Sequence, residues 1–135
     1  MKPMESTPRE HKQKYILVAE DDKFLARVYE MKLKAANYEV YIATDGGQVL
    51  NQLQTKKPDL LLLDLMLPVK NGFEVLDEIR KNPNLKNIKV ALFSNSIQEE
   101  EMKKAKDLGA IDYIVKSNIS IDDLIQKIEE YTAMP

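Results

Sequence analysis

A continuous apolar run, without polar alternation, stands near the middle of the chain. Four consecutive leucines, Leu60 to Leu63, lead directly into Asp64, with Pro58 before them and Pro68 after them. Such a run is typical of a strand that is buried on both faces, as in a parallel sheet, and the prolines argue against a helix. We therefore predict a central strand with Asp64 at its carboxyl end, where open α/β sheets place their functional groups. The alternative is an aspartate that merely ends a strand or caps a turn.

The other apolar segments have two different periods. Short runs rich in β-branched and aromatic residues predict further strands at 14–19, 39–43, 89–93 and 110–115. Apolar residues at helical spacing predict helices at 24–37, 48–55, 73–81, 97–108 and 121–132. Strict alternation of strand and helix predicts a parallel sheet with right-handed crossovers and helices on both faces.

Short polar residues stand at the predicted helix starts. Asp22 and Ser120 are expected to be N-caps. Two pairs have the spacing of a capping box: Asn71 with Glu74, and Ser96 with Glu99. On the first helix, we expect the apolar residues to gather about one side: Phe24, Leu25, Val28, Met31, Leu33 and Ala35.

The composition is that of a globular domain. Of the 135 residues, 44% are hydrophobic and 31% are charged, which suits one domain with its own core. The chain has no cysteine, which excludes disulfides, thiolate catalysis and cysteine-ligated metals. The net charge of −2 gives no general attraction to nucleic acid or to an anionic membrane, and no apolar run reaches the ~20 residues of a membrane helix. We expect a cytoplasmic protein without a direct nucleic-acid or membrane partner.

The ends of the chain differ from its middle. Residues 1–13 are polar, contain two prolines and show no periodicity, so we predict a disordered leader, one domain over residues 14–132 and a short tail at 133–135. His11 is the only histidine and lies in this leader. Histidine triads and multi-histidine metal sites are therefore excluded, and any metal must have oxygen ligands, which points to Mg²⁺.

Charged and hydroxyl residues follow four of the predicted strands. Glu20 and Asp21 follow the first strand, whereas Asp64, Ser94 and Lys116 stand at the ends of the third, fourth and fifth. Because parallel strands share one carboxyl edge, these residues should meet there. Crowded carboxylates repel one another unless a cation joins them. A carboxylate nucleophile with a metal, a lysine and a hydroxyl has the parts needed to accept a phosphoryl group as an aspartyl phosphate.

Four motifs carry a family resemblance. They are ILVAEDD at 16–22, LLLLDLMLP at 60–68 with Asn-Gly at 71–72, ALFSNS at 91–96 and GAIDYIVKS at 109–117. With these four motifs in this order, the chain resembles the receiver domain of two-component response regulators over about residues 14–132. The resemblance implies a (βα)5 flavodoxin-like fold with strand order 2-1-3-4-5, in a single-domain receiver like the chemotaxis regulators.

The resemblance also implies a metal site and a phosphoacceptor. Asp64 would accept the phosphoryl group. Asp21 would bind Mg²⁺ directly and Glu20 through water, with Asp64 and the backbone carbonyl of Met66 completing the protein ligands. Asp22 matches no metal ligand of the family, so it remains a predicted helix cap.

The resemblance further implies a switch and partners. Ser94 would be the switch hydroxyl, Lys116 would bind the phosphate, and Tyr113 would change rotamer as Ser94 moves. A packed strand aromatic is the alternative for Tyr113. The donor would be a sensor histidine kinase or a histidine phosphotransfer protein. Output to a downstream protein, or dimerisation, would use the face formed by the helix at 97–108, the strand at 110–115 and the helix at 121–132.

Two residues depart from the family pattern. Ser117 stands where a proline is usual, which makes a cis peptide bond unexpected there. Asn95 stands where a small residue is usual, so we predict that it restricts access to the phosphoryl site and slows exchange with donors and water.

Three other functions are compatible with a fold of this kind. A phosphorylation-independent interaction scaffold would not need the intact set of polar residues. An aspartate-nucleophile phosphatase would carry a second acid two residues after the nucleophile, where this chain has Met66. A flavin carrier would need a hydroxyl- and glycine-rich loop after the first strand, where this chain has three acids.

Overall fold

The computed structural model describes residues 13–134 of the chain. The strands are β1 (Tyr15–Ala19), β2 (Glu39–Ala43), β3 (Leu60–Asp64), β4 (Val90–Ser94) and β5 (Asp112–Val115). The helices are α2 (Lys23–Ala35), α3 (Gly46–Thr55), α4 (Gly72–Lys81), α5 (Glu99–Asp107) and α6 (Ile121–Ala133), with a 3-10 turn η2 (Lys116–Asn118) after β5. Apart from Gln13, the predicted disordered leader lies outside the described residues.

The five strands form one parallel sheet in the order β2-β1-β3-β4-β5. This order confirms the predicted flavodoxin-like fold. β3 is the central strand, and Leu62 lies between Val18 of β1 and Ala91 of β4. All carboxyl ends therefore lie at one edge of the sheet.

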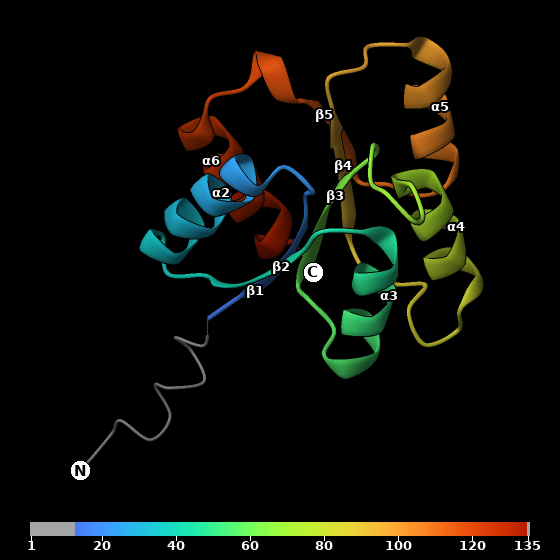
Figure 1. The fold of residues 1–135 in the computed structure, drawn as a ribbon, viewed down its shortest axis with the longest axis horizontal. Coiled ribbons are helices and arrows are strands. Elements are labelled where there is room, and N and C mark those ends of the chain that lie inside the picture. The colour runs from blue at the N-terminus through green and yellow to red at the C-terminus, as the bar shows by residue number, and fades with distance from the viewer. Residues whose placement is uncertain (1–12, 135) are drawn as a thin grey trace.

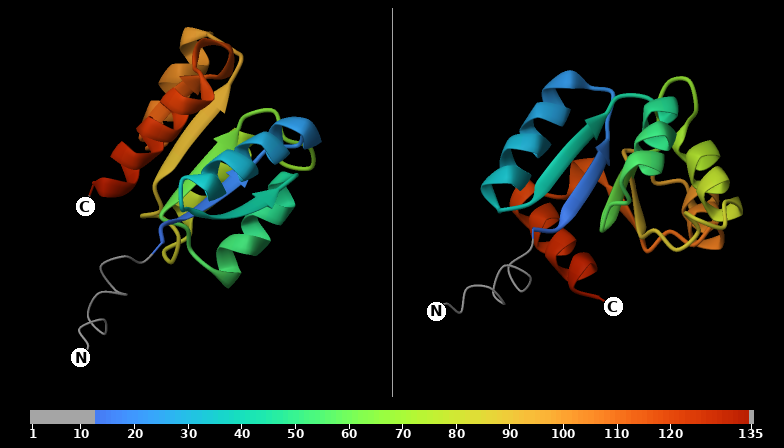
Figure 2. Two further views of the ribbon diagram at one scale, coloured as in Figure 1. Left: turned by 90° about the vertical axis from the view of Figure 1, so that its left-hand side faces the viewer. Right: turned by 90° about the horizontal axis from the view of Figure 1, so that it is seen from below.

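Helices cover both faces of the sheet. In Figure 1, α2 and α6 lie on one side and α3, α4 and α5 on the other, and the two further views in Figure 2 agree. The leucines of β3 serve the two cores in turn: Leu61 and Leu63 pack in one, Leu60 and Leu62 in the other. All four are 0% exposed, which confirms the prediction of a strand buried on both faces.

Most of the predicted caps are present. The Asp22 side chain accepts from the backbone N–H groups of Phe24 and Leu25 and thereby begins α2. Asn71 and Glu74 form the predicted capping box of α4, and Ser120 caps α6. These predictions are confirmed.

The predicted start of α5 is wrong. The helix begins at Glu99 and not at Ile97, and its N-cap Gln98 makes no side-chain capping bond. Ser96 does not form the predicted capping box with Glu99. Its backbone N–H instead donates to Ser94 Oγ at 3.1 Å, and its own Oγ accepts from the Gln98 N–H at 3.3 Å. The end of β4 therefore fixes Ser96 in a turn before the helix begins.

The predicted buried side of α2 is partly wrong. Phe24 and Met31 are 76% and 64% exposed, whereas Ala26, Tyr29 and Leu33 are buried. Phe24 and Met31 are seven residues apart and share one side of the helix. The buried stripe uses the three- and four-residue steps from Ala26, so it leaves that side to solvent.

The loop after β3 turns tightly and brings α4 close to Asp64. The Lys70 N–H donates to the Pro68 carbonyl at 2.8 Å, and Val69 between them has a positive φ of 71°, a strained conformation for a β-branched residue. Gly72 follows, and a Cβ there would lie 2.6 Å from the Asp64 carbonyl oxygen. Only glycine permits this close approach.

Candidate functional site

The carboxyl edge of the sheet brings two buried carboxylates to one lysine. Lys116 Nζ donates to Glu20 Oε1 at 2.7 Å and to Asp64 Oδ2 at 2.9 Å. The side chains of Glu20 and Asp64 are 1% and 5% exposed, and that of Lys116 is 13% exposed. Residues from the ends of β1, β3 and β5 therefore meet as the sequence pattern predicts.

Burial and ion pairing act against each other in this cluster. Burial raises the pKa of Glu20, and the hydrogen bonds from Lys116 and from the Asp22 N–H offset this only in part. For Lys116, burial pulls the pKa down, but the bonds to Glu20 and Asp64 outweigh it and raise the pKa above its usual value. The lysine is therefore a fixed positive charge at neutral pH.

The acidic residues form a group with the ligand chemistry of a hard cation. One carboxylate oxygen from each of Glu20, Asp21 and Asp64 lies within 4.8 Å of the others, and Asp21 is exposed. Two carboxylates are buried and one faces solvent, while Lys116 brings a single positive charge. The remaining negative charge and the all-oxygen donor set fit Mg²⁺, which takes one or two carboxylates and keeps several waters.

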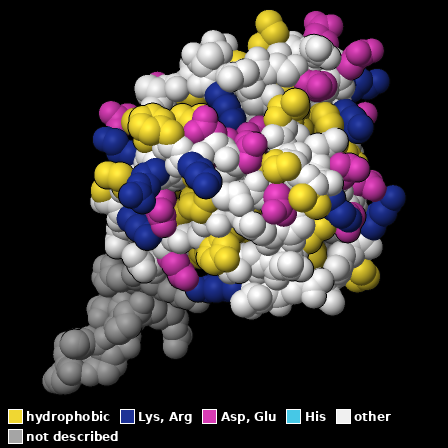
Figure 3. Space-filling view, viewed as in Figure 1, with side chains coloured by type: hydrophobic (Ala, Val, Ile, Leu, Met, Phe, Trp, Pro, Cys, Tyr) yellow, Lys and Arg dark blue, Asp and Glu magenta, His cyan; other side chains and the backbone are white. Residues whose placement is uncertain are grey.

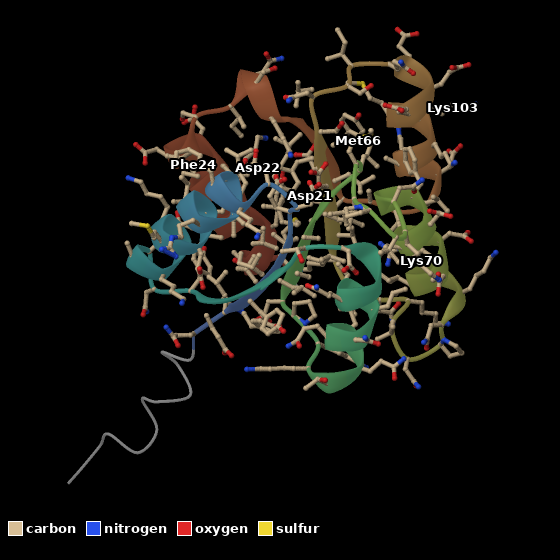
Figure 4. The ribbon with its side chains drawn as sticks, viewed as in Figure 1. Asp21, Asp22, Phe24, Met66, Lys70 and Lys103 are labelled. Carbon is tan, nitrogen blue, oxygen red and sulfur yellow. The ribbon has the colours of Figure 1, made fainter. Side chains whose placement is uncertain are left out.

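Met66 stands beside this group on the loop after β3. Its backbone N–H donates to Asp64 Oδ1 at 3.0 Å, so Asp64 is held at both oxygens. Its side chain is 75% exposed. Figure 4 shows Met66 above the end of β1, where Asp21 and Asp22 lie. Asp22 caps α2 and is not a member of the carboxylate group.

Ser94 and Tyr113 are joined through a residue that sequence reasoning assigned only to helix capping. Ser94 is 3% exposed, and its Oγ accepts from the Ser96 N–H. The hydroxyl of Tyr113, which is half-buried, donates to the Ser96 carbonyl at 2.9 Å. Ser96 therefore connects the end of β4 with β5, and only the fold brings these groups together.

Two aromatic rings behind the lysine also escaped sequence reasoning. Lys116 Nζ lies 4.7 Å from the centroid of the Phe93 ring, and the Tyr29 ring meets Phe93 edge-on at 5.6 Å. Burial raises the pKa of the Tyr29 phenol. Phe93 belongs to a predicted strand, for which core packing was the natural expectation, and Tyr29 was not among the apolar residues predicted for the first helix.

Exposed apolar side chains stand on the segments that follow three of the strands at this edge. Phe24, Met66, Val69 and Ile97 are each more than two-thirds exposed, at 76%, 75%, 78% and 67%. They follow the ends of β1, β3 and β4, and we call these four residues the apolar rim. Figure 3 shows hydrophobic side chains interspersed with acidic and basic ones on one face, and in Figure 4 Phe24 and Met66 flank Asp21.

A hollow of about 420 Å³ opens beside the carboxylates. Asp21, Met66 and Glu101 contribute to its lining, and one carboxylate oxygen of Glu101 is buried without a hydrogen-bond partner. The two residues that depart from the resembled pattern, Asn95 and Ser117, are both exposed. The peptide bond between Lys116 and Ser117 is trans, as predicted.

Comparison with known proteins assigns the chain to a family. A family model described as the response regulator receiver domain matches residues 16–129. The chain therefore belongs to the response regulator receiver domains, a family of signalling domains of two-component systems. Among the described residues, no helix is long and apolar enough to cross a membrane.

Solved structures support this assignment. The receiver domain of the Francisella response regulator 1452 is 28% identical, with a TM-score of 0.82 over 90% of this chain and 98% of that one. The Mn²⁺-bound form of response regulator Rcp1 is 36% identical, with a TM-score of 0.77 over 86% and 91%. The phosphorylated cyanobacterial phytochrome response regulator RcpA is 36% identical, with a TM-score of 0.78 over 90% and 94%.

Proposed function

We propose that this chain accepts a phosphoryl group on Asp64 from a phosphohistidine of a partner protein, in a Mg²⁺-dependent reaction, and thereby changes its protein contacts. One observation carries the proposal. Asp64 is a buried carboxylate that is held by Lys116 Nζ and by the Met66 N–H, within an acidic group that suits a divalent cation. The donor is a sensor histidine kinase or a histidine phosphotransfer protein.

The proposed reaction is a phosphoryl transfer between two side chains. An Asp64 carboxylate oxygen forms a bond to phosphorus, while the bond between phosphorus and the donor imidazole nitrogen breaks. That nitrogen keeps the electron pair and then takes a proton. Lys116 and Ser94 donate hydrogen bonds to phosphoryl oxygens, which places positive charge and donors where negative charge develops. Asp21, Asp64 and the Met66 carbonyl, with Glu20 nearby, would hold Mg²⁺, which would supply further positive charge toward these oxygens.

Two of the solved relatives support the metal and the modification. Rcp1 was observed with Mn²⁺ and RcpA in a phosphorylated form, and each is 36% identical to this chain. Mn²⁺ and Mg²⁺ both suit carboxylate and carbonyl ligands.

The apolar rim supplies a docking surface for the proposed donor. Its four side chains stand on segments that follow the strands whose ends carry the charged residues, and in such an arrangement apolar contacts can give affinity while the reacting groups meet. A donor histidine on a helix would bring its own apolar neighbours onto this rim.

The switch would act through the bonds at Ser96. When Ser94 moves to donate to a phosphoryl oxygen, it no longer offers the same acceptor geometry to the Ser96 N–H. Because Tyr113 bonds the carbonyl of that residue, the change reaches β5 and the face formed by α5, β5 and α6. This face is the proposed contact for a downstream protein or for a second copy of the chain.

The direct test uses a small phosphodonor such as acetyl phosphate with Mg²⁺ and intact-mass spectrometry. The wild-type protein should gain one phosphate, Asp64→Asn should gain none, and the matched control Asp59→Asn at the opposite edge should still gain it. Absence of phosphorylation in the wild-type protein, with either a small donor or a phosphorylated protein donor, would contradict the proposal. The chain would then be a phosphorylation-independent interaction scaffold.

A further inference from the structure

Lys116 has a third neighbour besides its two carboxylates. The face of the Phe93 ring lies 4.7 Å from Nζ, within the range of a cation–π contact. Phe93 is 1% exposed and the lysine side chain 13% exposed, so little water separates them. The ammonium has three N–H donors, two of which are used by Glu20 and Asp64.

We infer that Phe93 is a positioning residue for phosphoryl transfer, because its ring holds the Lys116 ammonium at the place where it must meet the phosphoryl group. The inference rests on the proposed function of Asp64. Phe93 is the register partner of Asp64 on the neighbouring strand, but its phenyl ring has no group that can bond or protonate a phosphoryl group, so it acts through the lysine.

The ring differs from the other two partners in a way that matters during the reaction. Asp64 exchanges its carboxylate charge for a phosphoryl group, and Glu20 belongs to the group that attracts a cation. Neither phosphorylation of Asp64 nor binding of a cation changes the quadrupole of the ring. The ring also cannot take a proton from the ammonium. Phe93 therefore keeps Lys116 in place while its carboxylate partners change.

The ring itself is fixed by the core. Phe93 precedes Ser94 on β4 and packs in the same apolar cluster as Ile128 of α6. The Tyr29 ring from α2 contacts it edge-on at 5.6 Å with an interplanar angle of 64°. Such a contact restrains the ring plane. The core cluster and the Tyr29 ring thus fix the ring that contacts Lys116 before any donor binds.

The first experiment compares rings of graded electrostatic strength at one site. Phe93 is replaced by Leu, and separately by 4-fluorophenylalanine and 3,5-difluorophenylalanine, which keep the ring but weaken its negative face. The control Ile128→Val removes one buried methylene from the same cluster without touching Lys116. We expect the maximal rate of phosphorylation by acetyl phosphate to fall by about three- to tenfold in Phe93→Leu. The maximal rates of the two fluorinated variants should lie between those of Phe93→Leu and wild type, and the variant with the more negative ring face should be the faster.

Two readouts separate positioning from general loss of structure. The affinity for Mg²⁺ and the KM for acetyl phosphate should stay within about twofold of wild type, since the ring does not touch ion or donor, whereas the maximal rate falls. In NMR spectra of the full chain, the ε-methylene protons of Lys116 should show an upfield ring-current shift that Phe93→Leu removes and Ile128→Val retains.

A double-mutant cycle completes the test. If Phe93 acts through the lysine, Phe93→Leu should cost no further rate in a Lys116→Ala background. Equal rates for wild type and Phe93→Leu, or a full additional loss in the Lys116→Ala background, would overturn the inference. If the wild-type chain is not phosphorylated, the proposed function fails, and the ring-current shift still decides whether Phe93 holds the lysine.

Discussion

The two edges of the sheet use similar charged residues in opposite ways. At the amino edge, Lys89 Nζ donates to the Tyr131 carbonyl at 2.9 Å near the end of α6, and Asp59 accepts from the Tyr15 N–H at 2.7 Å. Both of these charges are matched to a backbone group. At the carboxyl edge, Lys116 bonds only side chains, and one ammonium faces several carboxylates.

The charges at the amino edge are neutralised or hydrogen-bonded within the fold, whereas those at the carboxyl edge are left partly uncompensated. A lysine on terminal helix carbonyls satisfies groups that the helix itself leaves unpaired. Carboxylates gathered around one lysine leave net negative charge, which costs stability until a cation or another partner arrives. The charges at the amino edge therefore stabilise the fold, whereas the carboxyl edge keeps negative charge that a cation can bind.

The largest expected effect comes from removing the lysine of each edge. In Lys116→Ala, two buried carboxylates lose their cation, so we expect the free energy of unfolding to fall by about 3 kcal/mol. Millimolar Mg²⁺ should restore much of this loss, because it binds the folded state alone. Lys89→Ala should cost about 1 kcal/mol whether or not Mg²⁺ is present. Urea unfolding with and without Mg²⁺ measures the loss of stability in both variants. If the loss in Lys116→Ala did not depend on Mg²⁺, the proposed difference between the two edges would be wrong.

The next effect concerns the apolar rim of the carboxyl edge. We expect Phe24→Ala to slow transfer from a phosphorylated protein donor by about tenfold, because an exposed aromatic anchor is lost from the interface. Transfer from acetyl phosphate should be unchanged, since a small donor needs no docking surface. The matched control is Met31→Ala on the same side of α2, which should leave both rates near wild type. Equal effects of the two substitutions would place the docking surface elsewhere.

Conversion of one aspartate to asparagine at each edge should change stability in opposite directions. Asp64→Asn removes one of the crowded carboxylates but leaves Glu20 to bind Lys116, so we expect a gain of about 1 kcal/mol in metal-free buffer. Asp59→Asn weakens a charge-assisted bond to the backbone and should lose about 0.5–1 kcal/mol. Thermal or urea unfolding without Mg²⁺ gives both values. A lower free energy of unfolding in Asp64→Asn would show that the carboxylates at the carboxyl edge do not destabilise the fold by mutual repulsion.

The smallest effect concerns access to the proposed phosphoryl site. We expect Asn95→Ala to raise the rates of phosphorylation by acetyl phosphate and of dephosphorylation about two- to threefold, since a bulky exposed side chain next to Ser94 is removed. Asn87→Ala, at the amino edge, should change neither rate. Loss of radiolabel from the isolated phosphoprotein measures dephosphorylation, and unchanged rates in Asn95→Ala would remove access as a role for this residue.

Much of this arrangement was predictable because it follows from local order along the chain. Glu20 and Lys116 directly follow a strand, and Asp64 and Ser94 end one, so a parallel sheet is enough to place them at one edge. The caps at Asp22 and Asn71 depend on neighbours within three residues, and both are present.

The errors and omissions concern contacts that the spacing of residues along the chain does not reveal. Phe24 is apolar and lies close to helical spacing, but which side of α2 meets the sheet depends on the whole fold. Ser96 has the spacing of a helix cap, yet its bond to Ser94 takes precedence. The ring of Phe93 meets Lys116 only because β4 and η2 lie together, and no spacing along the chain encodes that meeting.

The alternation of the leucines in β3 has a consequence for how the molecule opens. Leu61 and Leu63 belong to the core beneath α3, α4 and α5, and Leu60 and Leu62 to the core beneath α2 and α6. If either helical layer detached, leucines of β3 would become exposed to solvent. The helices on one face of the sheet therefore do not stay folded without those on the other. Backbone amides of β3 should therefore exchange with solvent only through global unfolding. The strand that carries Asp64 would then be among the last parts of the protein to move, while the loops above it adjust.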